Sequence, residues 1–270
     1  MFYIDKKTYD FSVWDVSKVY AGLGGKLWEL LMGDQIHIGG ADQTDVLAMK
    51  IGLDKKSNIY LLDICSALGG PARHLAKVYG TRVVGLDITP EMIKEAKKRT
   101  EGESYADKIE YRIGSALDIP AHANTFDVVW GQDAWCYVRD KSRLLEEINR
   151  VLIPGGTVGF TDWIWGSVDA PEAYIDSLME FMVFPDMQTL DGYSKLIRVI
   201  GMKLKENEDL GDDFAKHMDI YISTLQKNKE NIINGFGEEL YHEAERGVLA
   251  WQNAAHNKWV SRGLWIAKKP

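Results

Sequence analysis

The sequence predicts an α/β fold in which a doubly wound, mostly parallel sheet carries helices on both faces. Apolar stretches alternate with helical ones between residues 59 and 163, and two of these stretches end in a carboxylate, Asp63 and Asp87. A turn of small residues at 65–70 follows the first carboxylate and leads into a helix. Near-continuous apolar strands are typical of parallel sheets with both faces covered. Ligands are then expected at the carboxyl ends of the strands.

The elements follow in order along the chain. A helix is predicted at 18–32, although Gly22, Gly24 and Gly25 weaken its pattern. The glycines within 33–40 permit unusual backbone conformations and close approach, as a lid over a bound ligand requires. Strands are predicted at 59–64, 82–87, 109–113, 125–130, 157–162, 203–210 and 262–268, with a turn at 154–156. Further helices are predicted at 41–51, 71–79, 90–100, 141–151, 171–182, 190–200, 214–233 and 238–256.

We predict one domain over residues 1–270. Within it we expect a helical lid at 1–51, a ligand-binding core at 52–163, cap helices with the sixth strand at 164–256, and a terminal strand at 257–270.

Composition restricts the partners of the chain. Its net charge of −8 leaves no basic stripe for a nucleic acid, and no apolar run approaches the roughly 20 residues of a membrane span. The start of the chain has no basic region followed by an apolar one, so we expect a cytoplasmic protein. The two cysteines, Cys65 and Cys136, have no metal-site spacing, and no metal is predicted. A homodimer is left open.

Asp63 and Asp87 narrow the class of ligand. A dinucleotide loop presents N–H groups to a pyrophosphate, so a carboxylate at the exit of the first strand is unfavourable there. Asp63 occupies that exit and suits a cationic group, such as the ammonium or sulfonium of S-adenosylmethionine. Asp87 lies where a carboxylate accepts both ribose hydroxyls. A packing turn with a capping aspartate is the alternative.

Further motifs follow the two aspartates in a fixed order. They are Gly-Gly-Pro-Ala-Arg at 69–73, Gly-Ser-Ala-Leu-Asp-Ile-Pro at 114–120, Phe-Asp-Val-Val-Trp at 126–130 and Val-Leu-Ile-Pro-Gly-Gly at 151–156. With them the chain resembles the class I S-adenosylmethionine-dependent methyltransferases over about 36–163. The resemblance implies a Rossmann-like seven-stranded sheet of order 3-2-1-4-5-7-6 with the last strand antiparallel. Segments 36–40, 69–73 and 132–134 resemble the branch of sarcosine/dimethylglycine and phosphoethanolamine N-methyltransferases.

The resemblance also implies roles for residues that would bind the cofactor, S-adenosyl-L-methionine. They are Asp63, Cys65, Ser66, Gly69, Ile38, Gly39 and Gln132 for the methionine part, Asp87 for the ribose, and Ile88, Ser115, Ala116 and Leu117 around the adenine. Two positions depart from the pattern, because Cys65 and Ala67 replace the usual glycines of the first turn.

A third departure concerns catalysis. Where the N-methyltransferase branch commonly has a histidine, four residues after Asp133, this chain has Tyr137. Trp28 stands where the phosphobase subgroup has a tyrosine, which disfavours a phosphoethanolamine substrate. Candidate bases are Tyr137, His37 and Asp162, and a structural role for His37 is equally compatible with the sequence.

Aromatic residues near the strand ends suggest an acceptor site. Trp135 and Trp163, with Trp28, would attract a cationic amine, and Arg262 would bind a carboxylate. We therefore expect a methyltransferase whose partner is a small-molecule methyl acceptor, with N-methylation of a glycine, sarcosine or dimethylglycine type of amine favoured. The alternatives are O-, S- or C-methylation of an aromatic or thiol metabolite, and a non-catalytic sensor of the cofactor. Cys65 and Cys136 end neighbouring predicted strands, which leaves a thiol pair open.

Overall fold

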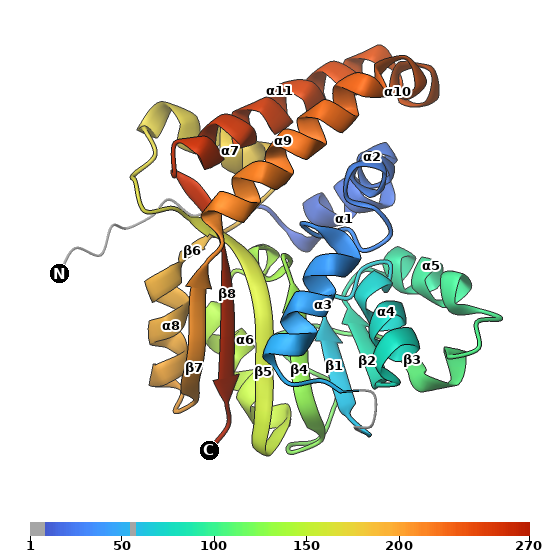
Figure 1. Ribbon diagram of the computed structural model, residues 1–270, viewed down its shortest axis with the longest axis vertical. Coiled ribbons are helices and arrows are strands. Elements are labelled where there is room, and N and C mark those ends of the chain that lie inside the picture. The colour runs from blue at the N-terminus through green and yellow to red at the C-terminus, as the bar shows by residue number, and fades with distance from the viewer. Residues whose placement is uncertain (1–8, 55–57) are drawn as a thin grey trace.

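The computed structural model describes residues 9–54 and 58–270, so the first eight residues of the predicted lid lie outside it. Its strands form one sheet with the path β3-β2-β1-β4-β5-β8-β7, and β6 pairs with β5 (Figure 1). The strands are β1 Tyr60–Ile64, β2 Arg82–Asp87, β3 Ile109–Ile113, β4 Phe126–Gln132, β5 Leu152–Trp165, β6 Gln188–Thr189, β7 Lys203–Asp209 and β8 Val260–Lys268. Among the strands of the described residues, only β8 runs antiparallel to its neighbours, β5 and β7. The predicted order is confirmed once the short β6 is set aside.

Helices cover both faces of the sheet (Figure 1). On one face lie α3 Gly40–Lys50, α4 Gly70–Tyr79 and α5 Pro90–Thr100, and on the other α6 Lys141–Val151 and α8 Leu190–Val199. Successive residues of a strand point to opposite faces. Leu61 accordingly packs with Leu47 and Leu75 of α3 and α4, whereas Leu62 packs on the α6 side. This alternation gives the doubly wound core predicted from the sequence.

The remaining helices form a cap beyond one end of the sheet (Figure 1). They are α1 Val13–Ala21, α2 Leu23–Met32, α7 Glu172–Met182, α9 Gly211–Lys227, α10 Lys229–Phe236 and α11 Glu238–His256. Apart from α1, these helices share one apolar core with Trp163 and Trp165 at the end of β5. This core attaches the cap to the sheet.

Two predicted helices are each divided in the structure. The helix predicted at 18–32 breaks at Gly22, whose backbone is extended, with φ −94° and ψ −161°. Its first half also begins earlier, at Val13, where Ser12 and Asp15 form a capping box. The helix predicted at 214–233 ends at Asn228, whose side chain donates to the Thr224 carbonyl at 2.8 Å. Such a local side-chain bond competes with continued helix.

The turn predicted at 154–156 is an irregularity inside a longer strand. β5 begins at Leu152, and its register with β4 jumps from Phe126–Leu152 to Val128–Thr157. Gly155 takes φ +80° at the jump, which glycine adopts without strain.

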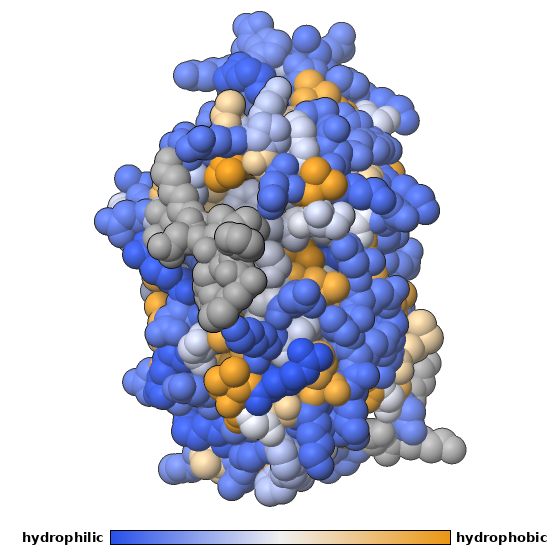
Figure 2. Space-filling view, turned by 90° about the vertical axis from the view of Figure 1, so that its left-hand side faces the viewer, coloured by the Kyte–Doolittle hydropathy of each residue, from blue (hydrophilic) through white to orange (hydrophobic). Residues whose placement is uncertain are grey.

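The surface seen in Figure 2 is mostly hydrophilic, with hydrophobic residues in small groups between polar ones. Over residues 9–54 and 58–270, no helix combines the length and the apolar character that crossing a membrane requires.

Candidate active site

A cavity of about 410 Å³ opens at the carboxyl ends of β1, β2 and β4, under α1. This is the edge at which parallel sheets bind ligands. The predicted site residues that line the cavity are Asp63, Cys65, Ser66, Asp87, Ile88, Ser115, Ala116, Leu117, Gln132 and Tyr137.

The turn after β1 has a left-handed backbone at positions without glycine. Cys65 takes φ +62° and Ala67 φ +44°, and each such residue costs on the order of 1–2 kcal/mol. Hydrogen bonds from the Ser66 N–H to the Leu86 carbonyl, at 3.0 Å, and from the Gly69 N–H to the Ser66 carbonyl, at 2.7 Å, hold the turn closed. Gly69 lies outside the cavity lining, where a Cβ would stand 2.2 Å from the Tyr111 hydroxyl.

Asp87 is held in a fixed orientation at the end of β2. Its Oδ2 accepts the Ala67 N–H and its Oδ1 accepts the Thr89 N–H, both at 2.9 Å. Burial raises the pKa of Asp87, and the backbone N–H groups oppose that rise. The turn and the carboxylate therefore position each other.

Asp63 is a buried carboxyl group with an unpaired oxygen. It is 2% exposed, and its Oδ2 has no hydrogen-bond partner in the part of the chain that the structure describes. Burial, with the negative charge of Asp87, raises the pKa of Asp63 well above its ordinary value. Ser66 Oγ and Gln132 Nε2 are likewise buried and unpaired there. Because unpaired buried polar atoms are costly, this wall of the cavity suits a polar ligand.

Gln132 presents its amide nitrogen as the unpaired atom for a specific reason. Its Oε1 accepts the Trp130 indole N–H at 3.1 Å and the Thr44 hydroxyl at 2.9 Å. Since an indole nitrogen only donates, it fixes the oxygen on that side. The NH₂ group is left to donate to a ligand in the cavity.

His37 is not among the residues that line the cavity. Its Nδ1 lies 3.1 Å from the Ile38 carbonyl and its Nε2 lies 3.0 Å from the Thr44 hydroxyl, and the side chain is 2% exposed. Burial lowers the pKa of His37 to about 4, so the ring is neutral at neutral pH. These contacts assign His37 to the structure of the lid, the alternative that the sequence left open.

His37 should make the protein acid-labile. Its pKa is about 4 in the folded protein, against an ordinary value of 6.5, so the unfolded chain binds more protons between these pH values. The contribution is present above pH 6.5 and is lost as the pH falls toward 4, by up to about 3 kcal/mol. We expect His37→Gln to flatten the free energy of unfolding against pH in that window, as measured by urea titration. Equal slopes in the two proteins would contradict this assignment.

An ion pair joins the lid to the sheet beside the cavity. Arg262, which is 0% exposed, donates through Nε to Asp133 Oδ1 at 2.8 Å, and Asp133 Oδ2 accepts the Ile38 N–H at 3.0 Å. The other guanidinium nitrogens bond Gln43 and Thr161. Arg262 is therefore fully engaged, contrary to its predicted role in binding substrate. Ile38, whose N–H is bound by Asp133, is fully buried and is not among the residues that line the cavity.

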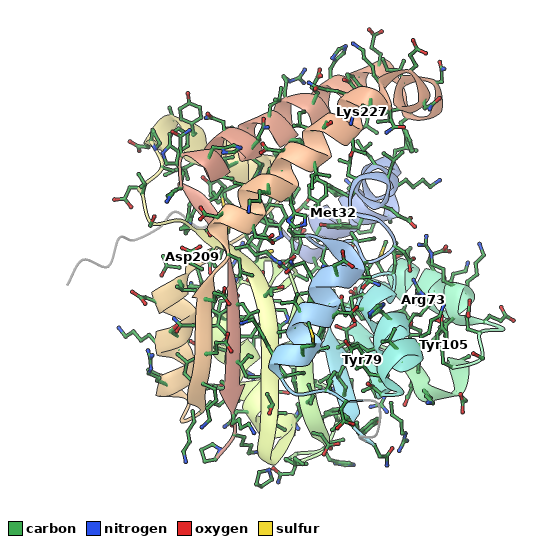
Figure 3. The ribbon with its side chains drawn as sticks, viewed as in Figure 1. Met32, Arg73, Tyr79, Tyr105, Asp209 and Lys227 are labelled. Atoms are coloured by element: carbon green, nitrogen blue, oxygen red, sulfur yellow. The ribbon has the colours of Figure 1, made fainter. Side chains whose placement is uncertain are left out.

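A second arginine holds the lid at its opposite side. Arg73 of α4, labelled in Figure 3, bonds both carboxylate oxygens of Asp34 and the Leu68 carbonyl. Gly39 takes φ +72°, and its N–H donates to the Tyr221 hydroxyl at 3.0 Å rather than lining the cavity.

The three tryptophans expected at the acceptor site lie outside the cavity lining. Trp135 is 0% exposed and stacks on Phe160, with ring centroids 4.2 Å apart. Trp163 packs edge-on against Trp251 in the cap core, and Trp28 contacts Phe181. These three rings therefore do not form the aromatic acceptor site expected from the sequence. Trp163 and Trp28 pack in the cap core and Trp135 packs in the core under α6 and α8, where burial removes their apolar surface from water.

Asp162 is also absent from the residues that line the cavity. It is 0% exposed and accepts the Cys136 N–H at 3.0 Å and the Tyr193 hydroxyl at 2.7 Å. Burial raises its pKa to about 6. Cys136 is buried in the cap core, whereas Cys65 lines the cavity, and both are free thiols.

Tyr137 does line the cavity, and its partner is a residue that sequence reasoning missed. The Tyr137 and Tyr20 hydroxyls lie 2.6 Å apart, and burial raises the pKa of both phenols. Other lining residues from the same N-terminal region are Asp10, Phe11, Ser12, Val13 and Val16. The Ser12–Asp15 capping box was the available signal for this helix.

Comparison with known proteins agrees with this geometry. A methyltransferase domain profile matches residues 62–160. The glycine/sarcosine/dimethylglycine N-methyltransferase of Actinopolyspora halophila is 29% identical over 265 residues, covering 98% of this chain and 45% of that protein. The sarcosine/dimethylglycine N-methyltransferase of Halorhodospira halochloris is 26% identical over 253 residues, covering 88% of each. Phosphoethanolamine N-methyltransferase 2 of Haemonchus contortus, solved with S-adenosyl-L-methionine, has a TM-score of 0.88 at 23% identity, covering 98% of this chain and 61% of that one.

The fold, the carboxylates at the strand ends and these matches define the class. The chain carries a methyltransferase domain match at 62–160, and the curated relatives to which it is similar over most of its length are methyltransferases, which agrees with the class and cofactor predicted from the motifs. Its curated relatives include sarcosine/dimethylglycine and phosphoethanolamine N-methyltransferases, the branch that the residue pattern indicates. The chain spans less than half the length of the Actinopolyspora halophila protein.

Proposed function

We propose that this chain transfers a methyl group from S-adenosylmethionine to a small amine of the glycine, sarcosine or dimethylglycine type. The observation that carries the proposal is the Tyr20–Tyr137 pair, which lies in the same cavity as Asp63 and Asp87. Carboxylates suited to the methyl donor and a pair of hydroxyls suited to an amine therefore line one cavity.

The unpaired polar atoms of the cavity support a place for the cofactor. Asp63 would receive the ammonium group, Gln132 would donate to the carboxylate, and Asp87 would accept the ribose hydroxyls. The apolar side chains of Ile88 and Leu117 would enclose the adenine. When bound, the cofactor supplies a methyl group whose transfer needs no acid for the leaving group.

The phenol pair would orient the acceptor amine. Because burial raises the pKa of Tyr20 and Tyr137, both hydroxyls are neutral at neutral pH. One hydroxyl donates to the other, which leaves lone pairs to accept an amine N–H and one hydroxyl proton to donate. An amine that enters as its free base is thereby held with its lone pair directed, and positioning of this kind can supply most of the rate.

Tyr137→Phe should separate acceptor positioning from cofactor binding. We expect kcat/KM for the amine to fall roughly 10- to 100-fold, because the hydroxyl that orients the nucleophile is lost. The affinity for S-adenosylhomocysteine should not change. Tyr20→Phe is the matched comparison and should show the same pattern. Tyr137→His restores the residue common in the branch and should add an ionisation near pH 6.5 to the rate profile.

The acceptor class is tested with labelled cofactor and a panel of glycine, sarcosine, dimethylglycine, phosphoethanolamine, a catechol and a thiol. Transfer to one of the first three amines supports the proposal. Transfer only to the catechol or the thiol would replace it with the O- or S-methylation alternative. Tight cofactor binding without turnover on any acceptor would favour the sensor alternative.

A further inference from the structure

Arg139 is the one cationic side chain among the described residues that line the cavity. Arg262, the arginine expected there, is occupied by Asp133, Gln43 and Thr161. We propose that Arg139 binds the carboxylate of an amino-acid acceptor and so selects acceptors that carry a carboxylate. This inference rests on the proposed function, since it names the substrate class of that same site.

The sequence position of Arg139 places it close to Tyr137, one of the two phenols proposed to bind the acceptor. It follows Tyr137 by two residues, just after the short 3₁₀ helix η2 Trp135–Tyr137 at the end of β4. Tyr137 and Arg139 line one cavity, so an acceptor could present its amine to the phenols and its carboxylate to the guanidinium. A guanidinium binds a carboxylate through two parallel N–H bonds, which fixes orientation as well as charge.

The N-terminal segment holds Arg139 near the cavity mouth. Its Nη2 donates to the Tyr9 carbonyl and lies 3.2 Å from Asp10 Oδ1. Tyr9 is itself anchored, because its N–H donates to the Pro185 carbonyl at 3.0 Å and its hydroxyl bonds Asp176. The Tyr9 carbonyl takes one Nη2 proton and Asp10 lies at the same nitrogen. Because both forks of a guanidinium include Nη2, a substrate carboxylate would take the place of Asp10 at Nη2 and add a second bond from Nε or Nη1.

The existing ion pair of Arg139 is of the kind that a substrate can displace. The Arg139 side chain is 49% exposed and that of Asp10 is fully exposed. Ion pairs between exposed side chains are weak. A substrate carboxylate that enters beside Asp10 would compete with it for the guanidinium.

The charges around the cavity favour a carboxylate over a phosphate. Asp63 and Asp87 also line it, and a phosphate dianion would face these carboxylates with a single arginine to neutralise it. A carboxylate carries one charge and needs one guanidinium. The geometry therefore points to a zwitterionic amino acid and away from a phosphobase.

The test compares acceptors that differ only in the anionic group. Sarcosine and dimethylglycine are paired with N-methylethanolamine and N,N-dimethylethanolamine. For Arg139→Gln we expect KM for the carboxylates to rise about 10- to 100-fold, the effect of losing a charged hydrogen bond, with KM for the amino alcohols unchanged. Asp10→Asn should lower KM for the carboxylates, since it removes the competitor. Arg198→Gln, an exposed arginine on α8, is the matched control and should change nothing.

The outcomes separate this inference from the proposed function. If amines are methylated but Arg139→Gln leaves KM for the carboxylates unchanged, the assignment of Arg139 is overturned and the function stands. Preference for phosphoethanolamine over sarcosine would also overturn it. If no amine is methylated, the proposed function fails, and calorimetry of dimethylglycine with the protein saturated with S-adenosylhomocysteine decides on Arg139. Binding that Arg139→Gln abolishes supports the site, and no binding to the parent overturns it.

Discussion

Asp63→Asn is expected to weaken S-adenosylmethionine binding about 10- to 100-fold while raising the melting temperature of the ligand-free protein. Both effects have one cause. In the ligand-free protein the carboxyl group is buried, its Oδ2 has no partner among the described residues, and its pKa is raised well above its ordinary value. An amide of the same shape removes the cost of burying the charge and also removes the anion that a cationic ligand needs.

The pH dependence of the Asp63 effect follows from its raised pKa. The folded protein binds the Asp63 proton more tightly than the unfolded chain, so the stability penalty is absent in acid and develops as the pH rises through the folded-state pKa. The gain from Asp63→Asn should therefore appear at neutral pH and vanish in acid. A cationic ligand requires the ionised carboxylate, so affinity for the parent should rise with pH and that of the variant should not.

Calorimetry and thermal melting measure the two effects together. Asp107→Asn, an exposed aspartate of the 3₁₀ helix η1 Ala106–Lys108, is the control and should leave both values unchanged. Asp87→Ala should also weaken binding but should lower stability, because Asp87 holds two backbone N–H groups. Unchanged affinity in either site variant would mean that the cofactor is bound elsewhere.

Arg262→Met should lower stability by about 3–5 kcal/mol, because it leaves the Asp133 carboxylate buried without its partner. For a chain of this size that corresponds to a fall in melting temperature on the order of 10 °C. Asp133 also holds the Ile38 N–H, so the lid should loosen as well.

A double-variant cycle measures the coupling between the two charges. Asp133→Asn with Arg262→Met should recover part of the stability lost in either single variant, since no unpaired charge remains. Denaturant titration of the four proteins gives the coupling free energy. If the losses of the two single variants add up to that of the double variant, the coupling free energy is zero and the two charges do not stabilise each other.

The sequence predicted the strands, and it also predicted most residues of the cavity wall that carries Asp63 and Asp87, because their signals are local. Asp63 and Asp87 each end an apolar stretch, and parallel topology brings such ends to one edge. The acceptor side depends on packing between distant segments. Trp163 and Arg262 stand at strand ends that meet the cap and the lid, and whether such a residue faces a cavity or a core is decided by the segment that covers it.

The N-terminal residues were missed for a related reason. Tyr20 reaches Tyr137 across more than a hundred positions, and no pattern near either residue reports that contact. The glycines at 22–25 only weakened the predicted helix. In the structure the chain breaks at Gly22, and the helix before the break lies over the cavity.

The helix α1 that covers the cavity has no fully buried side chain along its described length. Its hydroxyl contacts to the core are Ser17 with Thr89, at 3.1 Å, and Tyr20 with Tyr137. Segments with so little buried surface open at a small fraction of the global unfolding free energy. Ligands can therefore enter and leave while the sheet and its carboxylates stay in place, so the rate of exchange and the geometry of the site can change independently in evolution.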